Sequence, residues 1–233
     1  MSDEPLAFSP EQFSGLARVF PLPNMVMFPH VMQALHIFEP RYRQLLEESL
    51  ATDRLIALGV LAPGWESDYE GRPALHPTAC LCRVATHQRT DQGTSNVLLL
   101  GVRRLRLGRE LPSQETGKLF RVVEAEILED AAPSDITASA AAGLQRELLA
   151  AFKRAIPKMP DAYDQLDQLL GNQISLGMLS DIVSYTIELD MNWKLRLLAE
   201  CDVVRRTHLL LEALSGRTPG TPGRPFPPLF SQN

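Results

Sequence analysis

Hydrophobic residues in the first half of the chain occur in short runs separated by Pro and Gly, a pattern that predicts β-strands. The run at 54–61 is almost continuously apolar, which indicates a strand buried on both faces. In Arg104-Leu105-Arg106-Leu107 the residues alternate, so the leucines face one way and the arginines the other. We expect strands at 18–22, 34–38, 54–61, 80–86, 96–102, 104–109 and 120–128, with a hairpin turn at 91–93.

Helical spacing appears once among these strands and then dominates the second half. Pro40 suits a first helical turn, and Tyr42, Leu45 and Leu50 follow it on one apolar stripe. Further along, apolar residues recur every three or four positions in segments that start after residues able to cap a helix. The expected caps are Ser134, Ser175, Asn192 and Asp202, and a short additional helix is expected at 161–170.

This order of elements predicts an α+β fold, with a β-rich lobe that forms a curled sheet or barrel and contains one helix, followed by a C-terminal helical bundle. The composition changes near residue 131, and the last eighteen residues contain five prolines and three glycines. We therefore divide the chain into an N-terminal extension at 1–17, a β-rich lobe at 18–130, a helical lobe at 131–215 and a Pro/Gly-rich tail at 216–233.

Composition narrows the function classes. A hydrophobic fraction of 45% with 22% charged residues excludes disorder throughout. The apolar runs are far shorter than the ~18 residues of a membrane span, so no membrane association is expected. The net charge of −5 argues against nucleic-acid binding by bulk charge. Three cysteines without a secretory signal predict reduced thiols and a cytoplasmic protein.

Motifs for catalysis are missing from the sequence. There is no GxxxxGK[ST] phosphate loop, no GxSxG elbow and no HExxH, so we expect no ATP hydrolysis, no catalytic residues and no cofactor. Cys80 and Cys82 lie two residues apart and would face the same side of a strand. A structural zinc site needs four ligands, and a second cysteine pair is lacking, so we interpret both as small core residues and expect no metal.

Charged residues supply two further candidates. Arg103, Arg104, Arg106 and Arg109 form the densest basic cluster, which would suit a phosphate or an acidic peptide, although we favour a solvated strand face. Glu39 precedes the first helix, and we interpret it as a structural hydrogen-bond partner rather than a general base.

The segment at 20–29 is the strongest candidate for binding, because three prolines, two methionines and two phenylalanines lie within ten residues. Met25, Met27 and Phe28 either plug one end of the sheet or form an apolar surface for polypeptides, a role that suits the adaptable side chain of methionine. Our hypothesis is that at least two of the three are partly exposed beside a concave surface.

The order of motifs from 18 to 214 resembles the Lon N-terminal domain, also called the Lon substrate-binding domain. The segments that carry the resemblance are Phe20-Pro21-Leu22, Phe28-Pro29, Leu35-His36-Ile37-Phe38-Glu39-Pro40-Arg41-Tyr42, the strands at 80–84 and 100–107, and the helical segments at 179–183 and 194–206.

The resemblance implies a β-rich lobe similar to PUA-like barrels, followed by a helical lobe. It also implies a non-catalytic protein that binds unfolded or partly folded polypeptides, with a separate ATP-dependent protease as a candidate partner. The ATPase and Ser–Lys protease modules of Lon proteases are not in this sequence, so we expect a stand-alone protein without enzyme activity. Two alternatives stay open: a small hydrolase with a site at the lobe junction, and an RNA-binding protein by analogy with PUA-like domains.

Overall fold

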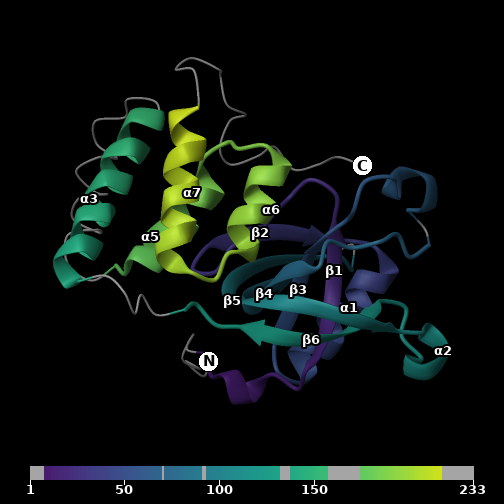
Figure 1. Ribbon diagram of the computed structural model, residues 1–233. Helices are drawn as coiled ribbons and strands as arrows, with labels where there is room; N and C mark the ends of the chain where they lie inside the picture. The colour runs from purple at the N-terminus through teal and green to yellow at the C-terminus, as the bar shows by residue number, and fades with distance from the viewer. Residues whose placement is uncertain (1–7, 70, 91–92, 132–136, 157–173, 217–233) are drawn as a thin grey trace. The chain divides into compact units, whose positions relative to one another are not determined.

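The computed structural model describes residues 8–69, 71–90, 93–131, 137–156 and 174–216. The chain divides into two compact units, Met1–Glu129 and Asp130–Asn233. Strands dominate unit 1 and helices dominate unit 2 (Figure 1), which confirms the predicted α+β class.

Unit 1 is built on one six-stranded sheet with the order β2-β5-β4-β3-β1-β6. Since β6 also pairs with β5, the strands β1, β3, β4, β5 and β6 close into a barrel, and β2 lies outside this ring. The β1–β3 pair is parallel and the other pairs are antiparallel. The strands are β1 (Leu16–Leu22), β2 (Met32–Ile37), β3 (Leu55–Val60), β4 (Thr78–Arg89), β5 (Ser95–Leu111) and β6 (Arg121–Leu128).

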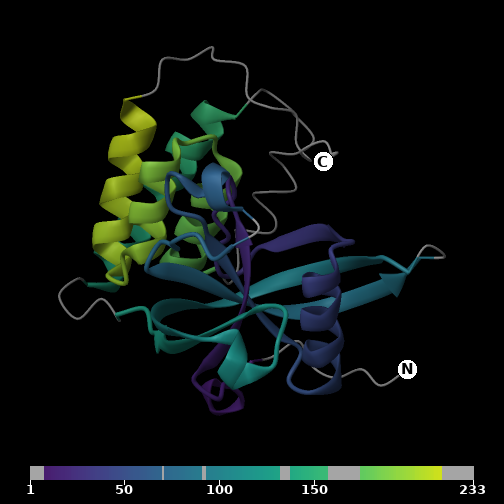
Figure 2. The same ribbon diagram turned by 90° about the vertical axis from the view of Figure 1, so that its right-hand side faces the viewer.

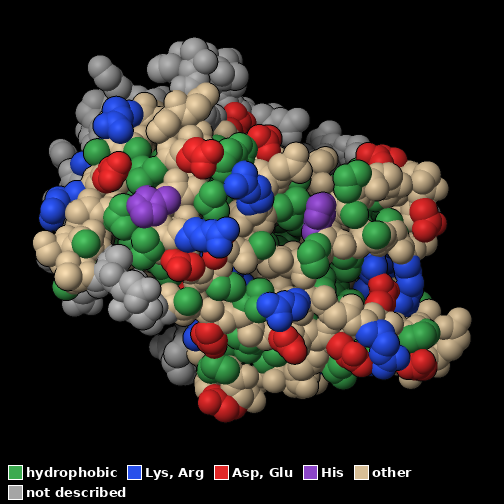
Figure 3. All heavy atoms as spheres, viewed as in Figure 1, with side chains coloured by type: hydrophobic (Ala, Val, Ile, Leu, Met, Phe, Trp, Pro, Cys, Tyr) green, Lys and Arg blue, Asp and Glu red, His purple; other side chains and the backbone are tan. Residues whose placement is uncertain are grey.

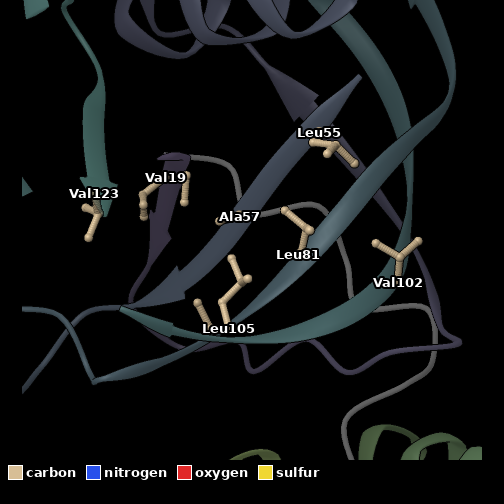
Figure 4. Packing of buried hydrophobic residues seen from close by; sticks show 9 residues of the cluster. Val19, Leu55, Ala57, Leu81, Val102, Leu105 and Val123 are labelled. Atoms are coloured by element: carbon tan, nitrogen blue, oxygen red, sulfur yellow. The ribbon is translucent and has the colours of Figure 1, made fainter. Parts of the chain in front are cut away.

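The barrel interior is filled by aliphatic side chains from all five of its strands (Figure 4). Every residue of β3 is buried, as its continuous apolar run predicts. Val19, Leu81 and Leu105 come from three different strands and are at most 1% exposed. This core holds the barrel together by burial of apolar surface, at roughly 25 cal/mol per Å².

The long strand β5 corrects one prediction, because it is continuous where the sequence suggested two strands separated at Arg103. Its register against β4 shifts between Leu81 and Cys82, which face Arg103 and Gly101, so Val102 is an extra residue on β5. Such a bulge bends a strand without ending it. The bend lets the first half of β5 pair with β2 and the second half with β6.

Short helices complete unit 1. Helix α1 (Pro40–Ala51) begins at Pro40 as predicted and buries Tyr42, Leu45 and Leu46. It lies beside the β4–β5 hairpin, which extends away from the barrel in Figure 2. The remaining elements are η1 (Pro10–Gln12), η2 (Trp65–Asp68) and α2 (Ser113–Thr116).

Unit 2 contains α3 (Ala138–Ala155), α5 (Leu176–Thr186), α6 (Met191–Ala199) and α7 (Val203–Ser215). Ser175 and Asp202 cap α5 and α7 as predicted, and each side chain accepts a main-chain N–H. The prediction for α6 is wrong, because Asp190 rather than Asn192 accepts the N–H of Trp193. Thr137 caps α3. The expected cap Ser134 and the expected helix at 161–170 lie outside the described residues.

Candidate functional site

The three candidate binding residues of the 20–29 segment do not share one environment. Met27 is 1% exposed and Phe28 is 0% exposed, whereas Met25 is half-buried. The hypothesis that at least two of them are partly exposed is therefore wrong. Met27 and Phe28 are therefore buried core residues, and of the three only Met25 reaches the surface.

The segment that contains these residues makes a close main-chain contact with β5. The His30 N–H donates to the Gly101 carbonyl at 2.8 Å, and the Gly101 N–H donates to the Val31 carbonyl at 2.9 Å. Two successive residues thus face one glycine, and His30 has a positive φ of 65°, which is the geometry of a β-bulge. This bulge leads directly into β2 and brings the main chain of Phe28 against Gly101.

An exposed apolar face lies on β2 and just after it. Met32, Ala34, His36 and Phe38 are all exposed and occupy alternate positions, so they share one face of the extended chain. Met32 is 47% and Phe38 is 46% exposed, which is high for large apolar side chains. The His36 and Phe38 rings stack with centroids 6.1 Å apart. We define these four residues as the β2 face.

Sequence reasoning placed a strand at 34–38 but gave these residues no role. The available signal was the stretch from Met32 to Phe38, in which apolar residues predominate and none is Lys, Arg, Asp or Glu. Apolar residues occupy both faces of such a strand, so the sequence alone does not tell which face is covered, and the exposure of Met32 and Phe38 needed the structure.

The arginine cluster is not a free basic surface. Arg106 pairs with Glu126 at 3.2 Å and Arg109 pairs with Glu124 at 2.9 Å, both across the β5–β6 pair. Arg104 is only 2% exposed, so the expected solvated face holds for Arg106 and Arg109 but is wrong for Arg104. On the face that Figure 3 presents, positive and negative side chains are likewise interspersed over the described strands. These pairings do not favour the RNA-binding alternative.

Other residues singled out by the sequence have structural surroundings. Cys80 and Cys82 are both buried in β4. Among the residues that the structure describes, no three His, Cys, Asp or Glu side chains are grouped to hold a metal ion. Glu39 accepts hydrogen bonds from Tyr69 at 3.0 Å and Arg41 at 2.9 Å, which confirms it as a hydrogen-bond partner.

A hollow of about 360 Å³ in unit 1 is lined by Arg41, Arg72, Lys118 and Arg121 among others. Each of these cations has a carboxylate partner: Glu39 for Arg41, Glu48 for Lys118, and Glu110 for both Arg72 and Arg121. The hollow is thus the surface of an ion-pair network rather than an unpaired cationic site.

Glu48 ties α1 into this network. Partial burial raises the pKa of its carboxyl group, but hydrogen bonds from Lys118 and Arg18 outweigh burial and hold the pKa below its usual range. A lowered pKa in the folded state stabilises the protein above the unfolded-state pKa near 4.3, and this contribution is lost as the pH falls through the folded-state value.

We expect Glu48→Gln to destabilise unit 1 at pH 7 by about 1 kcal/mol or less, because the ion pairs are partly exposed. The deficit relative to the unmodified protein should shrink as the pH is lowered from 5 to 3, since the native carboxylate then becomes neutral as well. Urea unfolding of both proteins across this pH range measures the difference. A deficit that is constant with pH would contradict the charge-based explanation.

A second hollow, of about 400 Å³, lies between α1 and the β4–β5 hairpin. It is lined by apolar Leu46 and Leu50 and by the charged residues Arg43, Glu47 and Arg89. Because this lining mixes positive, negative and apolar side chains, it does not indicate one class of ligand. None of the helices in the described part of the chain is both long and apolar enough to cross a membrane.

Comparisons with known proteins agree on one family. Residues 17–216 match the family model described as the ATP-dependent protease La (LON) substrate-binding domain. The Lon protease of Xanthomonas oryzae pv. oryzae is 26% identical over 215 residues, which are 92% of this chain and 24% of that protein. The Lon protease of Heliobacterium modesticaldum is 24% identical over 197 residues, or 84% of this chain and 23% of that protein. The chain thus spans about a quarter of these relatives.

Solved structures support the same fold. A Lon N-terminal domain protein from Xanthomonas campestris aligns with a TM-score of 0.61 at 20% identity, over 84% of this chain and 97% of that one. The N-terminal domain of a Mycobacterium avium complex Lon protease aligns with a TM-score of 0.66 at 16% identity, over 87% of this chain and 100% of that one. At these identities the likeness establishes the shared fold.

Proposed function

We propose that this chain, which belongs to the family of Lon (protease La) substrate-binding domains, binds unfolded or partly folded polypeptides without catalysing a reaction itself. The observation that carries the proposal is the β2 face, where Met32 and Phe38 are about half exposed on a domain of this family. An ATP-dependent protease is the proposed recipient of the bound polypeptide. The cytoplasm is the proposed compartment, because no disulfide joins the three cysteines, as is usual in a reducing compartment.

Burial of apolar surface on the β2 face sets the scale of the affinity. Covering a large apolar side chain completely is worth roughly 1.5–3 kcal/mol, so covering the exposed half of Met32 or Phe38 is worth about 1 kcal/mol. A few such contacts yield weak binding with broad selectivity, because apolar contact does not require one particular client sequence.

We expect the double variant Met32→Ser/Phe38→Ser to bind reduced and carboxymethylated α-lactalbumin, a permanently unfolded protein, five- to tenfold more weakly. The side chains removed are already half in water, so the melting temperature should change by only a few degrees. Fluorescence anisotropy with the labelled probe measures the affinity.

The matched control is Leu16→Ser/Leu119→Ser, which removes two side chains that are 43% and 64% exposed elsewhere on unit 1. This variant should bind the probe as the unmodified protein does. Equal weakening in both double variants would show that the β2 face has no special role. Unchanged binding in the Met32/Phe38 variant would refute the assignment of this face.

A further inference from the structure

Strand β2 has a hydrogen-bonding edge that the rest of the sheet does not use. It pairs with β5 on one side, and no described strand pairs with its other side. The other five strands each have neighbours on both sides, because β5–β6 pairing closes the barrel. An open edge presents main-chain N–H and C=O groups in a row, which is a template for another extended chain.

The bulge at Gly101 determines which residues of β2 point outward. Because the Val31 carbonyl accepts from Gly101, Val31 directs its main-chain groups toward β5. Main-chain direction alternates along an antiparallel pair, so Gln33 and Leu35 also point toward β5, whereas Met32, Ala34 and His36 point away from it. A separate contact agrees, since the outward Ala34 carbonyl accepts from the Gln33 side-chain amide at 2.7 Å.

The residues of β2 do not protect this edge. Natural sheets discourage pairing at open edges with lysine, proline, bulges or inward-pointing charges. The strand Met-Gln-Ala-Leu-His-Ile contains no proline, glycine or charged residue other than the ionisable His36. The His36 ring is engaged with the Asn96 side chain, with 2.7 Å between Nδ1 and Oδ1. No described strand covers this edge, where the Ala34 carbonyl is engaged by the Gln33 side-chain amide, and the exposed β2 face runs beside it.

We propose that a bound polypeptide adds to β2 as an extra strand, pairing its main chain with the outward groups of Met32, Ala34 and His36. The inference rests on the proposed function and specifies how that function is carried out. Six residues of strand span about 20 Å, which defines the length of client that is held. Main-chain groups are common to all polypeptides, so this pairing supplies affinity without sequence preference, and Met32 and Phe38 add a preference for apolar clients.

Hydrogen exchange on the unmodified full chain tests the pairing directly. With reduced and carboxymethylated α-lactalbumin at saturation, the amide protons of Met32, Ala34 and His36 should exchange at least tenfold more slowly, measured by NMR. The amide protons of Gln33 and Leu35, which already face β5, should change little. Slower exchange at the outward positions and not at the inward ones is the signature of strand addition.

A substitution at Ala34 provides the second measurement. Ala34→Pro removes one outward N–H at an edge position where proline is tolerated, so the fold should persist. Probe affinity should fall at least fivefold. The matched control Ala34→Ser keeps the N–H and should bind within twofold of the unmodified protein.

The possible results separate this inference from the function on which it rests. If the probe binds but the exchange rates at Met32, Ala34 and His36 do not change, strand addition is overturned and polypeptide binding stands. If the probe does not bind the unmodified protein, both fail. Protection of these amides without the probe, increasing with protein concentration, would assign the edge to a second copy of this chain and overturn the proposal.

Discussion

Replacing Arg206 with alanine is expected to destabilise unit 2 by about 3–5 kcal/mol, which is the usual cost of removing one partner from a buried ion pair. The Arg206 side chain is 0% exposed and donates to both carboxylate oxygens of Asp130, at 2.9 and 2.6 Å. Its Nε lies 3.5 Å from Asp181, whose side chain is also 0% exposed. The substitution would leave the Asp181 charge buried without this cation.

Further hydrogen bonds make Arg206 the centre of unit 2. It donates to the Glu200 carbonyl at 2.7 Å and to the Ser180 hydroxyl at 3.0 Å. Burial lowers the pKa of the guanidinium, but the hydrogen bonds and charges of Asp130 and Asp181 outweigh burial and raise it. Arg206 therefore stays charged at every pH at which the protein folds, and the loss in the variant should persist across neutral pH.

The measurement is urea unfolding followed by the fluorescence of Trp193 on α6, in a Trp65→Phe background that leaves one tryptophan in the chain. Arg205→Ala is the matched control, since Arg205 is the neighbouring residue on α7, has a side chain that is 74% exposed, and pairs with Glu200 at 3.1 Å. An exposed pair of this kind contributes about 1 kcal/mol or less. Equal destabilisation by the two substitutions would contradict the role assigned to the buried network.

Much of the fold could be predicted from local patterns in the sequence. The apolar run of β3 predicted a strand buried on both faces, and Ser175 and Asp202 predicted two helix starts, because these features depend on near neighbours. The start of α6, where Asp190 and not the predicted Asn192 is the cap, shows the limit of this reasoning. Both residues are good caps, two positions apart, and capping preference alone does not choose between them.

Features that depend on distant contacts were not accessible from the sequence. The main chain of Phe28 lies against Gly101, more than seventy positions away, and no local pattern reports that contact. The burial of Arg104 was likewise not predicted, because alternation along one strand does not tell which of its faces is covered. The open edge of β2 depends on which strands pair to close the barrel. The candidate site was therefore identified from the strand pairing and not from the residue types in the sequence.

Substituting Gly101 with alanine should have the second large effect, a loss of about 3 kcal/mol in the stability of unit 1. A Cβ atom at this position would lie 2.1 Å from the Phe28 carbonyl oxygen and 2.9 Å from the Phe28 carbonyl carbon. Both are main-chain atoms, so no side-chain rotation relieves the overlap. Insertion of atoms into a packed core typically costs 1–3 kcal/mol, and a rigid neighbour places the cost at the upper end.

Gly143→Ala is the matched control, because it makes the same chemical change at an interior position of α3 where a Cβ would meet nothing within 4 Å. Alanine there should stabilise unit 2 by about 0.5–1 kcal/mol, through the higher helix propensity of alanine. Urea unfolding followed by Trp65 for unit 1 and by Trp193 for unit 2 measures both changes.

Because Gly101 also sets the bulge that aligns β2, the Gly101→Ala variant should bind the unfolded probe more weakly even in buffer without urea, where most of the variant is folded. Unchanged stability of the Gly101→Ala variant would contradict the close packing of Phe28 against Gly101. A loss of stability with unchanged probe binding would show that the bulge is not needed for the function assigned to β2.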